Sequence, residues 1–200
     1  MAREQGGVVL KSIGWLVVLA VLASAGLFAF VQTQTPLALG AVKVGANAPA
    51  GLADPAGPAR YRPGGKIYVA TYIRNTGRLT VTLRGLGTTD APARAPYVPT
   101  ELLLGSGVTT NPDAATTFSD TSLAHGVGVG VLIVYTTNPD LVCGLLPADA
   151  GAKPVRLPGV PIRYTTYGID RTQTLTSKGL PEVAPPTRGA CEAARTASSG

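Results

Sequence analysis

The sequence predicts an all-β protein: an antiparallel β-sandwich of about seven or eight strands, preceded by one N-terminal transmembrane helix. Three observations predict this class. The 200 residues include 25 glycines and 17 prolines, and only 14% are charged, which disfavours long amphipathic helices. Short alternating segments rich in Val, Thr and Tyr recur between Gly, Pro and Asn. One uncharged apolar run near the N-terminus is long enough to cross a bilayer.

Residues 13–31 form this run, which we interpret as a signal-anchor. In a helix that rises about 1.5 Å per residue, it spans roughly 29 Å, close to the hydrocarbon thickness of a bilayer. Residues 1–12 are the predicted cytoplasmic tail, because Arg3 and Lys11 precede the run and only Lys43 follows it closely. We therefore expect a single-pass protein of the cell membrane with an extracytoplasmic C-terminal domain.

A cleaved signal peptide is the alternative interpretation of the same run. Ala23-Ser24-Ala25 has the small-x-small form of a cleavage site, and cleavage there would give a secreted protein. Residues 27–31 continue the apolar run beyond this site, which favours an uncleaved anchor. Both interpretations place the rest of the chain outside the cytoplasm.

The chain has two cysteines, Cys143 and Cys191. An even pair in an oxidising compartment predicts a disulfide bond. Residues 181–200 are otherwise a tail rich in Pro, Ala and Ser, with little reason to pack alone. We expect the bond to pin this tail to the domain.

The domain is predicted to follow a linker and first strand at 32–60, with that strand at 39–44, and to occupy residues 61–180. Period-two alternation and apolar content predict the other strands, at 66–74, 78–84, 101–104, 127–136, 161–167 and 171–177. Asn75-Thr76-Gly77 separates the first two of these, and this pattern predicts that they form a hairpin or strand pair. In the most apolar strand, Gly126, Gly128 and Gly130 share one face and predict close approach by another element.

The segment TTNPD occurs twice, at 109–113 and 136–140. Asn-Pro-Asp favours a tight turn in which the polar side chains bond back to the backbone. A divalent-cation site using Asp113 and Asp140 is disfavoured, because neither copy has carboxylates at the alternate positions of a calcium loop.

The stretch YRPGGKIYVATYIRNTGRLTVTLRGLG, residues 61–87, combines Pro-Gly-Gly, an alternating strand, Asn-x-Gly and a second alternating strand. It resembles bacterial Ig-like modules of cell-surface proteins, including the CARDB type. PIRYTTYGIDRTQTL, residues 161–175, and the late cysteine resemble membrane-anchored envelope proteins of bacteria. The resemblance implies an Ig-like sandwich used for adhesion, spacing or assembly, without catalytic residues.

The residues offer little for catalysis, and we predict no catalytic residue, cofactor or metal site. His125 is the only histidine, and no nucleophile-elbow motif accompanies it. A sortase-like transpeptidase using Cys143, His125 and Arg156 is an alternative, but VCGLL lacks the Thr-x-x-Thr-Cys pattern of that family. The protein is therefore not expected to be an enzyme.

Charge is distributed unevenly along the chain. Residues 60–94 contain seven basic residues against Asp90 alone, whereas residues 95–150 contain five acidic and no basic residues. An aromatic and basic binding patch is predicted in the first of these segments, formed by Tyr68, Tyr72, Arg74, Arg78 and Arg84. The alternative is a solvated basic face beside core tyrosines.

These features predict a structural or accessory subunit of an envelope or membrane assembly, with a protein partner. A binding module for anionic wall polymer or carbohydrate is the alternative, because a basic surface attracts anionic polymers. Nucleic acid is not an expected partner outside the membrane.

Overall fold

The computed structural model describes residues 5–44, 59–60, 65–87, 95–106, 111–144, 154–176, 180, 182–184 and 188–197. The chain forms two compact units, Met1–Thr35 and Pro36–Gly200. Residues 45–58, within the predicted linker, and residues 88–94, within the predicted domain, lie outside the described residues.

The first unit contains the helix α1 (Gln5–Thr33). Its segment Ile13–Phe30 is long and apolar enough to cross a membrane. The one hydroxyl in this segment is satisfied within the helix, because Ser24 Oγ donates to the Ala20 carbonyl at 2.8 Å. The predicted apolar helix is confirmed, although it begins at Gln5, inside the segment expected to be a tail.

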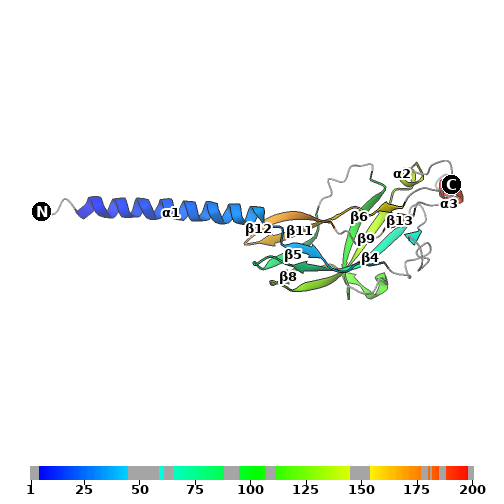
Figure 1. Ribbon diagram of the computed structural model, residues 1–200, viewed down its shortest axis with the longest axis horizontal. Coiled ribbons are helices and arrows are strands. Elements are labelled where there is room, and N and C mark those ends of the chain that lie inside the picture. The colour runs from blue at the N-terminus through cyan, green and yellow to red at the C-terminus, as the bar shows by residue number, and fades with distance from the viewer. Residues whose placement is uncertain are drawn as a thin grey trace. The chain divides into compact units, whose positions relative to one another are not determined.

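The second unit is a sandwich of two antiparallel sheets (Figure 1). The six-stranded sheet has the order β1-β4-β9-β6-β7, with β2 also paired to β4. Its strands are β1 (Leu37–Leu39), β2 (Lys43–Val44), β4 (Lys66–Asn75), β6 (Tyr97–Leu104), β7 (Thr116–Thr117) and β9 (Gly128–Thr137). The four-stranded sheet has the order β12-β11-β5-β8. Its strands are β5 (Val81–Leu86), β8 (Thr121–Leu123), β11 (Val160–Thr166) and β12 (Ile169–Leu175).

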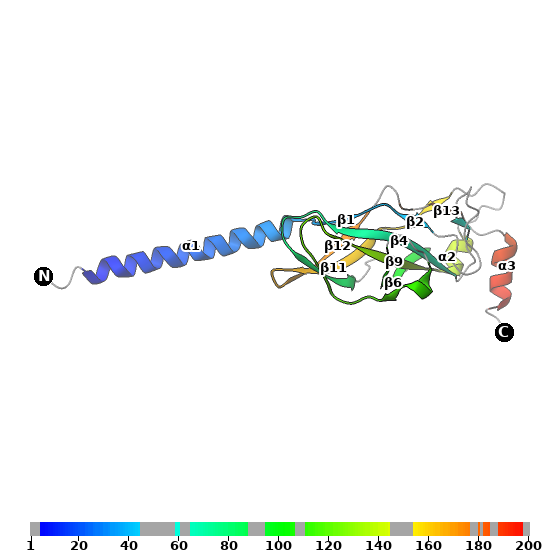
Figure 2. The same ribbon diagram turned by 90° about the horizontal axis from the view of Figure 1, so that it is seen from below.

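Smaller elements complete the described structure. A three-stranded sheet has the order β10-β13-β3, in which β13 and β3 are parallel. The remaining elements are β3 (Ala59–Arg60), β10 (Val155–Arg156), β13 (Glu182–Ala184), the 3-10 helix η1 (Pro112–Ala114), α2 (Pro139–Gly144) and α3 (Arg188–Ala197). Two views show α2 and α3 at one end of the sandwich and the β11–β12 hairpin at the other (Figures 1 and 2).

The predicted antiparallel sandwich is confirmed, with differences in detail. The two sheets hold more strands than the seven or eight expected, because β2, β7 and β8 are too short to show a period-two pattern. The segment 181–200 is not an irregular tail. It contains β13, whose Val183 is fully buried, and α3, whose Ala and Arg residues favour a helix.

The core lies between the two sheets and follows from alternation along each strand. In β4 and β9, the inward residues Ile67, Val69, Ile73, Val131 and Ile133 are fully buried. Residues of the four-stranded sheet face them: Val81, Leu83, Leu123, Ile162, Tyr164 and Leu175. Burying each such aliphatic side chain contributes about 1.5–3 kcal/mol, so this face provides most of the driving force.

A second apolar cluster lies on the opposite face of the six-stranded sheet. It consists of Tyr68, Ala70, Leu132 and Val134, with Leu103 and Ala115 packed against it. The residues around η1 follow β6 along the chain and contribute Ala115 to this cluster. As a result, β4 and β9 are buried on both faces over much of their length.

One polar atom in the core has no partner among the described residues. Thr71 points inward from β4 and is fully buried, and its Oγ1 makes no hydrogen bond. A buried hydroxyl without a partner destabilises the folded state relative to an apolar group of similar shape.

We expect Thr71→Val to raise the free energy of unfolding by about 1 kcal/mol, because the substitution removes the uncompensated desolvation of the hydroxyl. Chemical denaturation of the sandwich in detergent would measure this. Thr166→Val is the matched control, since Thr166 is also buried but donates to the Thr80 carbonyl at 3.1 Å. That control should lower stability, and a loss of stability in both variants would contradict the assignment.

Candidate functional site

Three residues of the predicted patch lie on one face of β4, the face that points away from the sandwich core. Alternation places Tyr68, Tyr72 and Arg74 there together. Tyr68 is buried in the second apolar cluster, whereas Tyr72 is 39% exposed and Arg74 is exposed. Only the last two are therefore available at the surface.

The other two predicted residues lie elsewhere. Arg78 is exposed in the turn between β4 and β5. Arg84 belongs to the four-stranded sheet, where it forms an ion pair with Asp120 and its Nε donates to Thr165 Oγ1 at 3.0 Å. Thr165 Oγ1 in turn donates to Asp170 at 2.5 Å. The predicted patch is thus divided, and Arg84 is paired with the Asp120 carboxylate.

A shift in strand register occurs at Arg84. Tyr164 pairs with Leu83 and Arg163 pairs with Gly85, so Arg84 has no partner in the ladder. Gly85 has a φ of 112°, a conformation that glycine adopts without strain. Periodicity alone does not reveal such a bulge, but the exposed position of Arg84 next to buried Leu83 agrees with alternation, and Arg84 leaves the patch because β5 belongs to the other sheet.

The glycines of β9 accommodate the exposed pair on β4. Tyr72 is opposite Gly130, and Arg74 is opposite Gly128. A Cβ at Gly128 would lie 3.3 Å from the Ile73 carbonyl oxygen and 3.5 Å from Arg74 Cβ. Arg74 Nε donates to the Gly126 carbonyl at 2.9 Å. The predicted close approach at these glycines is made by β4.

A buried asparagine organises the turns at this end of the sandwich. The side-chain amide of Asn75 donates to the carbonyls of Leu79, at 2.7 Å, and Leu123, at 2.9 Å. Its Oδ1 accepts from the Gly77 amide at 2.9 Å. His125 Nδ1 lies 2.8 Å from the Gly77 carbonyl oxygen. The predicted hairpin is wrong, because β4 and β5 lie in different sheets and do not pair. The Asn-x-Gly segment instead connects the two sheets and joins the 76–80 and 124–127 turns.

A third turn lies at the same end. Thr166 Oγ1 donates to the Thr80 carbonyl, which places the β11–β12 turn, residues 167–168, beside the 76–80 turn. We refer to the three turns, 76–80, 124–127 and 167–168, as the turn end.

The chain joins the sandwich at the turn end. The Pro36 carbonyl accepts from the Thr76 amide at 2.7 Å and from Thr76 Oγ1 at 3.0 Å. The side chain of Gln173 on β12 then pairs with the Leu37 backbone, accepting from its amide at 3.1 Å and donating to its carbonyl at 2.7 Å. Gln173 thus acts as a backbone substitute that ties β1 to the edge of the other sheet. Its isolated position within an ordinary alternating strand gave no signal of this role.

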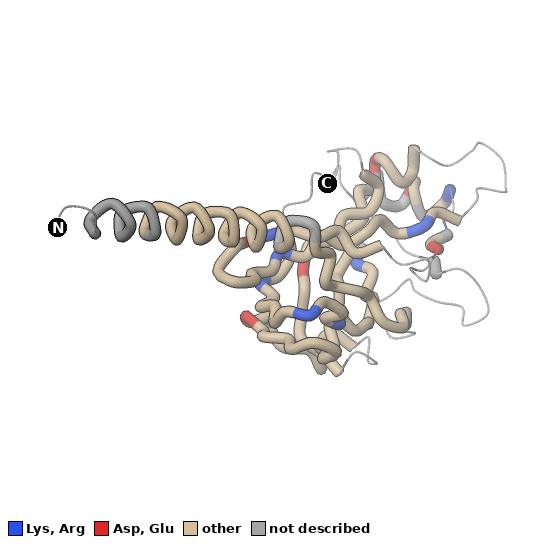
Figure 3. Tube along the Cα trace, turned by 60° about the vertical axis from the view of Figure 1, so that its left-hand side comes forward, with Lys and Arg blue, Asp and Glu red and all other residues tan. Residues whose placement is uncertain are grey.

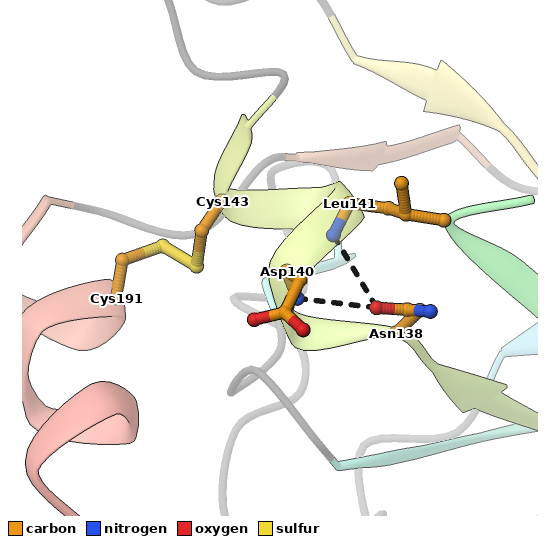
Figure 4. The surroundings of a disulfide bond; sticks show 5 residues. All are labelled: Asn138, Asp140, Leu141, Cys143 and Cys191. Atoms are coloured by element: carbon orange, nitrogen blue, oxygen red, sulfur yellow. Dashed lines mark hydrogen bonds between the residues drawn. A yellow bond between two sulfur atoms is a disulfide. The ribbon is translucent and has the colours of Figure 1, made fainter. Parts of the chain in front are cut away.

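The disulfide lies at the opposite end. Cys143 at the end of α2 is bonded to Cys191 of α3, as the sequence predicts (Figure 4). Asn138 caps α2, because its Oδ1 accepts from the amides of Asp140 and Leu141. In the other TTNPD copy, Asn111 accepts from the Asp113 amide in the same way. Both copies therefore begin short helices, which agrees with the predicted backbone bonding of the asparagine.

The described residues do not bring a catalytic set together. Cys143 and Cys191 consume both sulfurs, and His125 and Cys143 lie near opposite ends of β9, about 30 Å apart along the strand. Within the described ranges, no three His, Cys, Asp or Glu side chains are placed to hold a metal ion. Figure 3 shows the basic positions distributed over the sandwich.

Two buried tyrosines have structural environments. Tyr135 donates its phenol hydrogen to the Pro158 carbonyl at 3.0 Å, and burial raises its pKa. Burial also raises the pKa of Tyr164, which the nearby Arg171 charge partly offsets. Both phenols stay protonated and serve packing.

No protein-family model matches the chain, and no curated protein matches it either.

We expect Gln173→Ala to release β1 from β12, because both hydrogen bonds to the Leu37 backbone are lost. Amide hydrogen exchange at Leu37–Leu39 should accelerate by at least about tenfold, while exchange in β9 stays slow. Thr172→Ala, on the exposed face of the same strand, is the control. It should change neither the exchange rate of the Leu37–Leu39 amides nor that of the β9 amides. Equal protection of β1 in both variants would show that β1 is held by other contacts.

Removing the disulfide with Cys143→Ser and Cys191→Ser should lower the free energy of unfolding by about 3–4 kcal/mol, since the bond spans 48 residues. The amides of α3 should lose protection first, whereas α2 stays attached through buried Val142. Hydrogen exchange of oxidised, reduced and substituted protein would test this. Retained protection in α3 after reduction would mean that packing alone holds the helix.

Proposed function

We propose that this protein is a non-catalytic, single-pass membrane protein whose extracytoplasmic Ig-like sandwich serves as a structural or accessory subunit of an envelope or membrane assembly. The resemblance of residues 61–87 to CARDB-type modules supports this role, because such modules space and assemble surface proteins. The apolar segment Ile13–Phe30 supplies the span.

The observation that carries the proposal is the attachment of β1. Pro36 follows the end of α1 by only three residues, and its carbonyl is already bonded to Thr76. Gln173 then holds Leu37 on both backbone groups. A domain that searches for a distant ligand is served by a long flexible linker, whereas a short attachment built into the fold suits a subunit at a defined height.

The disulfide supports an extracytoplasmic position, because such bonds persist in oxidising compartments. The basic residues Arg3 and Lys11 before the apolar segment favour a cytoplasmic N-terminus. Both features suit the single-pass form and a secreted form alike, and the continuation of the apolar run over residues 27–31 favours the single-pass form.

The alternatives have less support. A transpeptidase needs a thiol near an imidazole, and Cys143 is oxidised and distant along β9 from His125. A wall-polymer module needs a continuous basic surface, but Arg84 is paired with Asp120 on a different sheet from Arg74.

Inserting a flexible Gly/Ser segment of about twenty residues between Thr35 and Pro36 would test the subunit role. Such a segment has an r.m.s. length of roughly 25 Å, so it abolishes the defined height without altering the sandwich. We expect the wild-type protein to be purified in mild detergent as a complex of fixed stoichiometry, and the insertion variant to lose its partner. Native mass spectrometry would measure both.

The same segment appended after Gly200 is the matched control and should leave the complex intact. A single-copy wild-type protein that pellets with wall material and is released by salt would support the polymer-binding alternative instead. An intact mass beginning near Gly26 would contradict the anchored form and favour secretion.

A further inference from the structure

We propose that the turn end of the sandwich rests on the lipid headgroups of the bilayer that α1 crosses. This inference relies on the single-pass arrangement proposed above. It concerns which surface of the sandwich meets the membrane, and the chemistry that holds it there.

The exposed apolar residues of the sandwich gather at this end. Among the described residues of the second unit, three large hydrophobic side chains are exposed: Tyr72 at 39%, Val127 at 47% and Tyr167 at 66%. Val127 and Tyr167 belong to the turn end itself. Tyrosine is enriched at membrane interfaces, where its ring is partly buried among the headgroups and its hydroxyl stays hydrated.

The charge of the turn end suits phosphate. The three turns contain Arg78 and His125, both exposed, and no aspartate or glutamate. Arg74 borders them, at the end of β4. The nearby Asp170 accepts a hydrogen bond from Thr165 on the outer face of the four-stranded sheet. Arginine binds phosphate through several donors at once, so this surface favours phospholipid headgroups over an apolar partner.

The turn at 167–168 presents its aromatic residue at a conformational cost. Tyr167 has a φ of 48° and Gly168 a φ of 74°, so both residues of this two-residue hairpin turn are left-handed. Asparagine or glycine is favoured at the first position, and tyrosine is strained there. Since the ring is mostly exposed, packing within the sandwich does not compensate for this strain. Contact between the ring and a surface outside the protein would compensate for this strain.

The length of the chain brings this end within reach of the bilayer. Three Cα steps of 3.8 Å limit the distance between Thr33, at the end of α1, and Pro36 to about 11 Å. If Ile13–Phe30 fills the hydrocarbon layer, then Thr33 lies within the headgroup layer, which is about 5–8 Å thick on each side. Pro36 is bonded to Thr76 of the turn end, so the turns cannot be far from the headgroups.

A single-tryptophan reporter in the full chain would test the contact. Trp15 is the only tryptophan, so Trp15→Phe provides a silent background for Tyr167→Trp. The protein is reconstituted into vesicles of phosphatidylcholine alone, or of phosphatidylcholine mixed equally with phosphatidylglycerol, each with lipids brominated near the headgroup. We expect blue-shifted emission and quenching by the brominated lipid, stronger in the anionic vesicles.

Asp140→Trp in the same background is the matched control. Asp140 is exposed on α2, beyond the far end of β9, about 30 Å along the strand from the turn end. Quenching at residue 167 should exceed quenching at residue 140 several-fold. Equal quenching at the two positions, or access of aqueous iodide to both without lipid quenching, would overturn the proposal.

Two further substitutions separate lipid contact from fold stability. Because one of them changes residue 167, the tryptophan reporter is placed at Val127→Trp in the Trp15→Phe background. Tyr167→Asn should raise the melting temperature, because it relieves the left-handed strain, and should reduce lipid quenching. Arg78→Glu should reduce quenching mainly in the anionic vesicles. If Tyr167→Asn stabilises the sandwich but leaves quenching unchanged, the tyrosine has no role at the membrane and the inference is wrong.

Flotation of the same vesicles distinguishes this inference from the proposed function. Protein that floats and resists carbonate extraction but shows no quenching at residue 167 contradicts the headgroup contact alone. Protein that fails to float contradicts the single-pass arrangement and the inference with it.

Discussion

The pairing of β4 with β9 is the constraint on which the rest of the sandwich depends. Nine consecutive residue pairs, from Lys66 with Thr136 to Arg74 with Gly128, keep one register without a bulge. Because side chains alternate across a strand, that register directs one set into the main core and the other into the second apolar cluster. It also places Tyr72 and Arg74 over glycines, where bulky side chains on β9 would crowd them.

The ends of these two strands define two different regions of the molecule. At one end, Asn75 bonds to both neighbouring turns, and Pro36 and Gln173 attach the first strand. At the other end, Asn138 caps α2 and Cys143 holds α3. The N-terminal side of the sandwich is fastened by hydrogen bonds, whereas α3 depends on a covalent bond. We therefore expect the end at which β1 is attached to be insensitive to redox state and the far end to be sensitive to it.

The proposed role and the proposed headgroup contact rely on the same features. In the proposed arrangement, a short attachment would limit how far the sandwich can turn away from the bilayer, and a turn end without carboxylates would reduce repulsion from phosphates. Arg84 illustrates the contrast, since its ion pair with Asp120 leaves the outer face of the four-stranded sheet locally balanced in charge. Arg74 and Arg78 stay exposed near the attachment, and Lys66 and Arg163 are exposed elsewhere on the sandwich.

The sequence by itself determined the apolar helix, the long alternating strands, the Asn-x-Gly turn and the cysteine pair, because each depends on local periodicity, turn chemistry or compartment. Tertiary structure alone decided which residues share a surface. Tyr68 and Arg84 left the predicted patch because an apolar cluster covers the first and the second belongs to a strand of the other sheet. Likewise, Gln173 reaches Leu37 across 136 residues. Such long-range contacts depend on how two sheets pack, which a one-dimensional pattern does not encode.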